Sequence, residues 1–475
     1  MALTTETPAR YSLEGALPAL TVEQSARVPL LLLVASALKW FAISALFGTL
    51  AFASLHAPGM GKLPFLTYGR VQPVFVDALV YGFLTNAAIA AGLYLICRLG
   101  RNTLALPSLV TVATLFYNIA LTVALVLILA GYNSSQQLFE FPKGPAIAMF
   151  ISFLPFALSA FLTNARRTVA EMYPTQWFVL AGFICFPWLL STAIWMIHLN
   201  NVTPMVHPSV HQWYANGVVA LWLVPVALGA IYYFTPKLSG RTLHSSGLAA
   251  FGFWTYIFFA GFGGFQFTSV LPRWYPAVSA AVAVLLLIPA ASNFLNWQRT
   301  ITGLKNRPEG QTWHLIRVSS VLYVIATVLA ALTAAGNTAN FFAFTFVVPG
   351  LFFLTTLGVV GFALLATIYY MVPRLTGCDW GKSIVLQRRL TIFGSMLLIL
   401  ALLIGGLRHA GGLNDPGKDF MSVLRSTFPF VGMGTVAMLV LLVSQLAGIG
   451  ALMRNFYGCC CGSANDRTRT AGRTH

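Results

Sequence analysis

The histidines are the side chains of this sequence best suited to bind a metal, and three of them, His198, His207 and His211, lie close together. His207 and His211 are four residues apart, so a helix would place both imidazoles on one face, as a pair of metal ligands requires. Pro208 directly follows His207 and disfavours a helix at that point. A metal pair and hydrated loop histidines at the start of a helix both remain open, and the proline favours the second.

A carboxylate in an apolar segment is the second candidate for chemistry. Asp77 lies within residues 71–97, an apolar stretch long enough to cross a membrane. An ionisable group in such a segment indicates a function by default. We expect Asp77 to lie within two helical turns of the outer membrane surface. Two interpretations therefore stay open: an Asp that carries protons, and a structural Asp that is hydrated or hydrogen-bonded.

The elements that position these residues are apolar helices. Apolar residues make up 58% of the 475-residue sequence and charged residues only 8%, a composition that indicates a bilayer environment and fits no soluble class. The sequence therefore predicts an all-α membrane protein. Its apolar windows predict twelve transmembrane helices, at about residues 29–54, 71–97, 107–131, 145–164, 176–199, 213–235, 248–268, 276–298, 315–336, 346–373, 390–408 and 427–453.

The basic residues indicate how these helices are oriented. If both ends of the chain lie on one side, the N-terminal segment, the even-numbered loops and the C-terminal tail hold 19 Lys and Arg, and the odd-numbered loops hold seven. The positive-inside rule then predicts cytoplasmic termini. The net charge of +17 is scattered singly among short loops, which argues against nucleic-acid binding.

Three regions are expected along the chain. Residues 1–28 form a polar cytoplasmic segment that lacks the short apolar core and cleavage site of a signal peptide. Residues 29–453 form the membrane domain, and residues 454–475 form a basic cytoplasmic tail. The tail contains the run Cys459–Cys461, for which a mobile segment is favoured over a metal or lipid-attachment role because three adjacent thiols cannot easily surround one ion.

Three of the predicted helices end in similar sequence motifs where they leave the membrane: GLYLICRLGR, IYYFTPKLSGR and IYYMVPRLTGC. We call these segments the exit motifs. Counting 17 to 19 residues back from the last tyrosine of each motif reaches a depth of roughly 25–29 Å along the helix. The residues found there are Phe75 in the first helix, Asn216 in the second, and Leu351 and Phe353 in the third. None of them is a usual metal ligand.

Five segments carry a resemblance to a known family: FLTYGRVQPVFVDALVYGF, HQWYANGVVALWLVPVALGAIYYFTPKLSGR, GFW…LPRW, IYYMVPRL and LRHAGGL…TFPFVGMGTV. In this order and spacing they resemble subunit I of the haem-copper oxidases, and most nearly the C-family, the cbb-type cytochrome c oxidase subunit I. The resemblance covers about residues 40–455. It implies three arcs of four helices, in which the second, sixth and tenth helices are equivalent, and a bacterial inner membrane.

The resemblance also implies where haem ligands would lie. The family uses one histidine of the second helix and a His-x-His pair of the tenth, and the corresponding positions here are Phe75, Leu351 and Phe353. Phenylalanine and leucine have no lone pair for iron, and phenylalanine fills space that a porphyrin would need.

The copper ligands of the family are likewise replaced. The histidine of the sixth helix corresponds to Asn216, whose amide is a poor copper ligand. The two adjacent histidines of the seventh helix fall within residues 264–267, at Gly264 and Phe265. With all six ligands missing, the sequence predicts that neither haem b nor copper is bound, and that oxygen reduction has been lost.

Three functions are therefore weighed. The favoured one is a non-catalytic membrane subunit that binds or helps assemble a respiratory complex, with other membrane subunits and a cytochrome c subunit as partners. The second is an oxidase-like enzyme with haem or copper at a relocated periplasmic site, built from the histidines expected on the outer side: His56, His198, His207, His211 and His409. The third is a transporter of protons or a small molecule through the emptied cavity, past Asp77.

Overall fold

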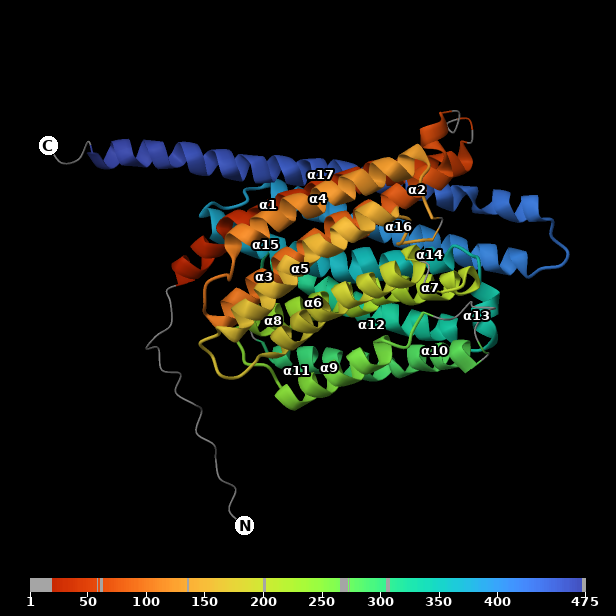
Figure 1. Cartoon of the computed structure of the whole chain (residues 1–475), viewed down its shortest axis with the longest axis horizontal. Helices are drawn as coiled ribbons and strands as arrows, with labels where there is room; N and C mark the ends of the chain where they lie inside the picture. The colour runs from red at the N-terminus through yellow and green to blue at the C-terminus, as the bar shows by residue number, and fades with distance from the viewer. Residues whose placement is uncertain are drawn as a thin grey trace, which may run out of the picture.

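The computed structural model describes residues 19–57, 59, 63–134, 136–199, 202–264, 272, 274–304 and 308–471, with side chains between residues 22 and 455. These residues form a bundle of helices that run roughly along one common direction (Figure 1). The described part of the chain contains no strand. The all-α fold predicted from composition is confirmed.

The first four spans follow the expected order. The first span is α1 (Ala19–His56). After the short turn η2 (Pro64–Leu66), the second span consists of three segments: α2 (Tyr68–Asp77), η3 (Ala78–Leu84) and α3 (Thr85–Gly100). The third and fourth spans are α4 (Pro107–Ala130) and α5 (Lys143–Ala165).

The middle spans contain more breaks. The fifth span consists of α6 (Pro174–Ala193) and η4 (Ile194–His198). The turn η5 (Pro204–Val206) leads into the sixth span, which consists of α7 (His207–Gly217), η6 (Val218–Leu223) and α8 (Val224–Ser239). The seventh is α9 (Ser246–Ala260), and the eighth consists of α10 (Trp274–Leu285) and α11 (Leu287–Ile301).

The last four spans end in a long helix. They are α12 (Gln311–Ala334), followed by the short α13 (Asn337–Phe342), then α14 (Val347–Phe353) with η7 (Leu354–Gly361) and α15 (Phe362–Thr376), α16 (Ser383–Leu413) and α17 (Phe420–Ala471). The run Cys459–Cys461 lies in the part of α17 beyond the described side chains.

The described residues include eleven helices that are long and apolar enough to cross a membrane. The seventh predicted span, residues 248–268, corresponds to the shorter apolar helix α9, and residues 265–271 lie outside the described part. Eleven long helices and one shorter helix agree with the architecture predicted from the apolar windows.

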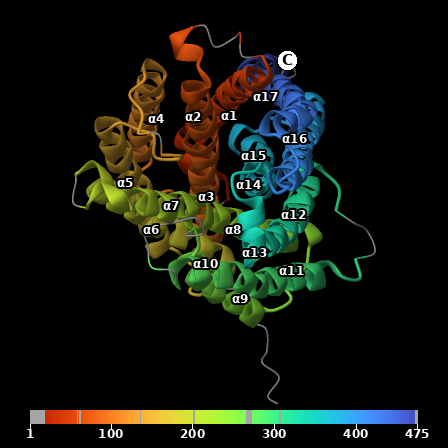
Figure 2. The ribbon, with the colours of Figure 1, turned by 90° about the vertical axis from the view of Figure 1, so that its right-hand side faces the viewer.

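Three of these spans pass through the centre of the bundle. They are the spans with the related exit motifs, and in their most apolar windows 100%, 89% and 83% of the residues are buried, against 33–61% in the other eight. The end-on view shows α3, α8, α14 and α15 near the middle of the bundle (Figure 2). The segments α3, α8 and α15 also contact one another.

The three central spans share a local irregularity. Each contains a π-helical segment, η3, η6 or η7, that begins 15 or 16 residues before the last tyrosine of its exit motif. Such wide turns are rare and often occur at functional sites. Their common position shows that the equivalence indicated by the exit motifs extends to the backbone.

The approach of α16 to the start of α14 is set by a glycine. A Cβ atom placed on Gly406 would lie 2.3 Å from the backbone nitrogen of Val347 and 2.7 Å from the carbonyl carbon of Phe346. Backbone atoms cannot move aside as a flexible side chain can, so any larger residue would push the two helices apart.

We expect Gly406→Ala to lower the free energy of unfolding by about 1–3 kcal/mol, because it overpacks the contact between α14 and α16. Thermal unfolding of the purified protein in detergent measures this. Gly411→Ala is the matched control in α16, since nothing lies within 4 Å of its position; equal unfolding temperatures for the two variants would contradict the packing argument.

Candidate functional site

Two phenyl rings meet at the first pair of positions singled out by the exit motifs. Phe75 of α2 and Phe353 of α14 are 3% and 4% exposed. Their rings stack with centroids 5.4 Å apart and planes at 21°. The ring of Phe52 contacts Phe75 edge-on at 6.3 Å, and the space left beside the stack is about 90 Å³.

This arrangement does not fit a haem. A flat macrocycle inserted between parallel rings would need two van der Waals separations, together about 7–8 Å, which exceeds the observed spacing. The remaining cavity is also below the range of about 300–1,000 Å³ that is usual for small-molecule sites. Neither ring carries a nitrogen that could bind iron.

The positions that correspond to the copper ligands of the family lie around Asn216. Its side-chain amide donates to the carbonyl of Ala260 at 3.3 Å. A Cβ atom on Gly263 would lie 3.1 Å from the amide nitrogen of Asn216, and one on Gly264 would lie 2.5 Å from its Cβ. Phe265 lies outside the described residues. The structure therefore brings Asn216 against Gly263 as well as Gly264, the first of the two expected positions.

A copper ion held by imidazoles does not fit this arrangement. With this backbone, a side chain at Gly264 would collide with Asn216, and the glycine has a φ of 96° that favours residues without a Cβ atom. A cavity of about 210 Å³ lies beside Asn216, and its described lining, which includes Tyr256, Tyr323 and Thr355, contains no imidazole or thiol. Leu351, four residues before Thr355, is partly buried.

Three of the histidines expected on the outer side, His198, His211 and His409, each have a partner of their own. The Nε2 atom of His211 donates to the carbonyl of Gln137. The imidazoles of His198 and His409 lie against the rings of Phe139 and Phe346, with centroids 4.9 and 5.0 Å apart. His56 is the last residue of α1.

The expectation of a loop at His207 is corrected. His207 is the first residue of α7, and its backbone is helical with φ −50° and ψ −44°. A proline at the second helical position is tolerated because its missing N–H has no partner within the first turn. His207 and His211 thus share one helix, but no group of three or more His, Cys, Asp or Glu side chains that could hold a metal occurs among the described residues.

Asp77 has a partner that the sequence did not reveal. It is the last residue of α2, its side chain is completely buried, and neither carboxyl oxygen receives a hydrogen bond from a described donor. The carboxyl group of Glu140, which is 3% exposed, lies within hydrogen-bond reach of it. Two carboxylates at such a distance in a medium of low polarity cannot both be charged, so the pair holds a proton between them.

The loop between α4 and α5 delivers Glu140 to the interior. Leu138 has a φ of 65° and turns the chain inward. Phe139 and Phe141 are fully buried on either side of Glu140. The hydroxyl of Tyr81 fixes the turn by a hydrogen bond to the carbonyl of Leu138, and it also bonds to the hydroxyl of Tyr214 at 3.0 Å.

This loop is therefore more than a surface connector between α4 and α5. Its polar letters GYNSSQQ suggest solvent exposure, but the following LFEF contains three large apolar residues in four. This apolar group was the available signal, since loops rarely bury such residues unless they fold back onto the core. Burial raises the pKa of the Glu140 carboxyl above its ordinary value.

Comparison with known proteins places this geometry in context. Residues 28–448 match the family described as Cytochrome C and Quinol oxidase polypeptide I. The Cbb3-type cytochrome c oxidase subunit CcoN1 of Stutzerimonas stutzeri is 25% identical over 426 residues, which cover 82% of this chain and 86% of the relative. A cytochrome c oxidase subunit 1 homolog of Agrobacterium tumefaciens (strain T37) is 22% identical over 397 residues, covering 78% and 71%.

A solved structure has a similar fold. A heme-copper terminal oxidase dimer determined by cryo-EM contains a chain that superposes with a TM-score of 0.70 at 15% sequence identity. The match covers 92% of this chain and 84% of that chain. At this level of identity the similarity concerns the arrangement of helices alone.

We expect the stability of the protein to fall as pH rises above about 4.5, the ordinary pKa of Glu, because the folded state keeps a proton on Glu140 that the unfolded chain has lost. Glu140→Gln removes this titration, and its amide can donate to Asp77. The free energy of unfolding of the variant should therefore rise relative to that of the parent from pH 5 to pH 8, by at most about 1.4 kcal/mol per pH unit. Glu171→Gln, at an exposed acid, is the control; parallel pH profiles for the parent and Glu140→Gln would disprove the assignment.

Proposed function

Because this chain belongs to the Cytochrome C and Quinol oxidase polypeptide I family, we propose that it is a subunit I-like membrane protein that has lost catalysis and serves as an accessory or assembly subunit of a respiratory complex. The stack of Phe75 on Phe353 carries the proposal. Two aromatic side chains fill the place where the family resemblance implies an iron-binding pair. A core refilled in this way keeps the bundle packed without a cofactor.

The copper-equivalent positions support the same proposal. An amide at Asn216 and glycine at Gly264 offer no imidazole, and the backbone at Gly264 leaves no room for one. A catalytic oxidase needs both centres, and here neither position has the required donors. What the chain retains from its family is the helical scaffold and the outer surface of that scaffold.

The proposed partners follow from this retained surface. The relatives described above are subunits of cytochrome c oxidases by name. A chain with the same fold can occupy a similar position beside other membrane subunits, or beside a cytochrome c subunit, without transferring electrons itself.

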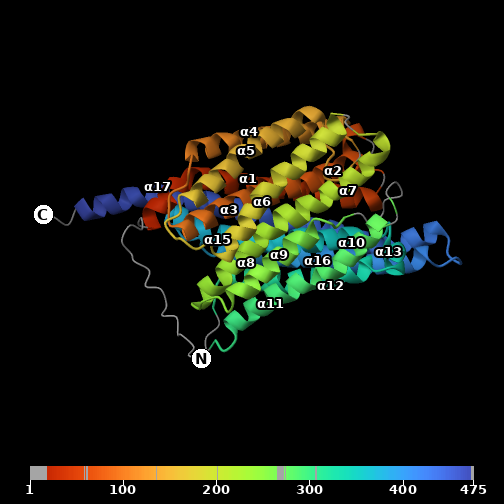
Figure 3. The same cartoon turned by 60° about the horizontal axis from the view of Figure 1, so that its bottom comes forward.

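The proposed location is a bacterial inner membrane with cytoplasmic termini. The start of α1 and the end of α17 lie at the same end of the bundle (Figure 3). The ends of α3 and α8 in the same region carry Arg98, Arg101 and Lys237. An excess of basic residues on that side supports the cytoplasmic assignment.

Haem and metal analysis of the purified protein tests the central claim. We expect a preparation without a Soret band, with less than about one tenth of an equivalent of haem b by pyridine haemochrome, and with no stoichiometric copper, because the ligand positions lack donor atoms. Stoichiometric haem b would refute the proposal. A Soret band that disappears in His207→Ala/His211→Ala would instead establish the relocated redox centre.

The accessory role has its own test. A tagged chain purified from native membranes in a mild detergent should bring down haem-containing respiratory subunits, and a harsher detergent should separate it from that haem. A haem spectrum that stays with the isolated chain would assign the cofactor to the chain itself and end the proposal.

Proton movement is the second candidate function, and the pair of Asp77 and Glu140 favours it. The pair is buried at the end of α2 and can exchange one proton. In proteoliposomes, Asp77→Asn should abolish any proton-driven uptake or leak that the parent shows, whereas Glu171→Gln should leave it unchanged. Equal proton fluxes in Asp77→Asn and the parent would exclude this function.

A further inference from the structure

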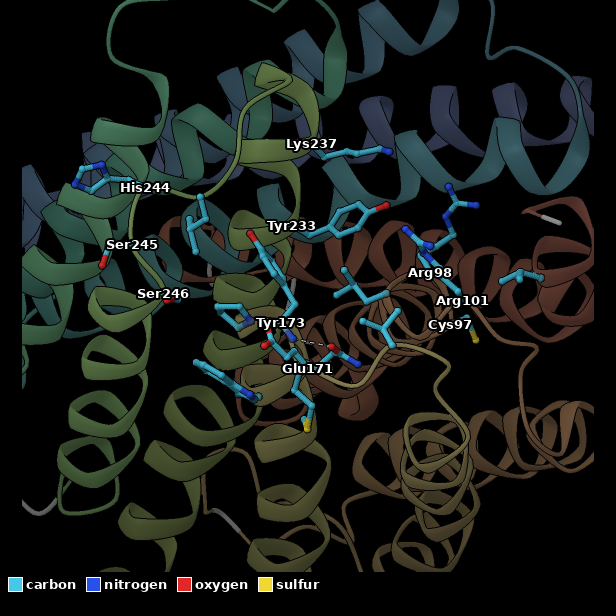
Figure 4. Close-up of a pocket in the computed structure, with 18 residues that line it drawn as sticks. Cys97, Arg98, Arg101, Glu171, Tyr173, Tyr233, Lys237, His244, Ser245 and Ser246 are labelled. Carbon is cyan, nitrogen blue, oxygen red and sulfur yellow. Dashed lines mark hydrogen bonds between the residues drawn. The ribbon is translucent and has the colours of Figure 1, made fainter. Parts of the chain in front are cut away.

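A large pocket opens at the end of the bundle where the basic residues gather. It has a volume of about 1350 Å³ and lies among the ends of α3 and α8, the starts of α6 and α9, and the loops that connect them. It is far from the ligand-equivalent positions, which lie before the π-helical segments toward the other ends of their spans. Figure 4 shows the side chains that line it.

The charge on the pocket wall is predominantly positive. Arg98, Arg101 and Lys237 line it, and Glu171 is the only acid in its described lining. Lys237 is exposed and has no ion-pair partner among the described residues. The guanidinium of Arg98 pairs with Glu23 at 3.2 Å, so the exposed ammonium of Lys237 carries the charge that an incoming negative group can use.

Figure 4 shows the basic groups on one wall of the pocket. Lys237, the hydroxyl end of Tyr233, Arg98 and Arg101 lie together on this side. The guanidinium of Arg98 donates to Glu23 at 3.2 Å, and Tyr233 lies beside it in the same view. Ammonium, guanidinium and hydroxyl groups in this combination are typical donors to a phosphate.

Apolar and aromatic side chains line other parts of the pocket, beside the polar Gln176, His244, Ser245 and Ser246. Val22, Leu99, Met172, Trp177 and Leu243 line the same pocket. Trp177 is packed against Phe253, with ring centroids 6.1 Å apart. Tryptophan and tyrosine side chains occur at the level of lipid headgroups, where one face is wet and the other is apolar.

We propose that this pocket binds an anionic phospholipid, with the phosphate against Lys237 and beside the Arg98 guanidinium, and with the acyl chains along the apolar residues of the pocket. The pocket is formed by the ends of membrane spans, where headgroups lie. The inference rests on the cytoplasmic orientation proposed above, since basic pockets between helices on that side bind anionic headgroups. A free phosphate would use the basic wall but would gain nothing from the apolar one. The volume exceeds the usual range for small soluble ligands, as a two-chain lipid requires.

Lipid titration of the purified full-length protein tests this inference. In mixed micelles, phosphatidylglycerol should bind saturably, and Lys237→Gln should weaken that binding about fivefold, the effect of about one basic residue on an anionic lipid. Lys237→Arg should retain most of the affinity. Phosphatidylcholine at the same concentration should not compete, because its headgroup is neutral overall.

Lys382→Gln is the matched control, because Lys382 is an exposed lysine at the start of α16 that does not line the pocket. Equal losses in Lys237→Gln and Lys382→Gln would reduce the effect to general surface charge and overturn the proposal. Competition by phosphatidylcholine would overturn it as well. If inorganic phosphate displaced the lipid with comparable affinity, the site would be one for a soluble anion. Unaltered unfolding temperatures of both variants without lipid would show that the exposed substitutions leave the fold intact.

Discussion

The structure depends on three helices that must pack against one another along the centre of the bundle. Because their side chains are buried on nearly every face, each position in the centre has to be filled by protein atoms or by a ligand. Phe75 and Phe353 fill one such position by direct contact. Asn216 fills another together with Gly263 and Gly264, which follow α9. The centre is thus closed by side chains where the family resemblance implies metal ligands.

A second consequence of this packing is the burial of polar groups that need internal partners. Within the described part, side-chain amides and hydroxyls bridge neighbouring helices: Trp40 and Asn86 both bond to Asn118, at 2.6 and 3.1 Å. Such bonds satisfy groups that lipid cannot. The acid pair of Asp77 and Glu140 is different, because two carboxyl groups satisfy each other only while they share a proton. A structural constraint and a capacity for proton exchange therefore occur at the same place.

The two ends of the bundle have different chemical characters. At one end, a loop rich in aromatic residues folds onto the central helices and covers Asp77. At the other end, the helices diverge around a basic pocket whose walls combine charge with exposed apolar surface. The first arrangement excludes water from a pair of acids, and the second offers cations to a ligand from the membrane surface. The proposed accessory role and the proposed lipid site are independent, since one depends on the centre of the bundle and the other on its end.

The sequence by itself determined the membrane environment, the number and order of the spans, and the equivalence of the three central helices, because apolar length and the repeated exit motifs are local properties. It also located Phe75, Asn216 and Phe353 by counting residues back from the three exit motifs. Only the tertiary structure decided what these residues touch. The stacking of Phe75 on Phe353 joins residues far apart in the sequence, and the approach of Glu140 to Asp77 depends on a loop that turns inward at Leu138. Helical periodicity predicts the face on which a residue lies, but the partner on the other side of that face is set by the packing of separate helices, which no local pattern specifies.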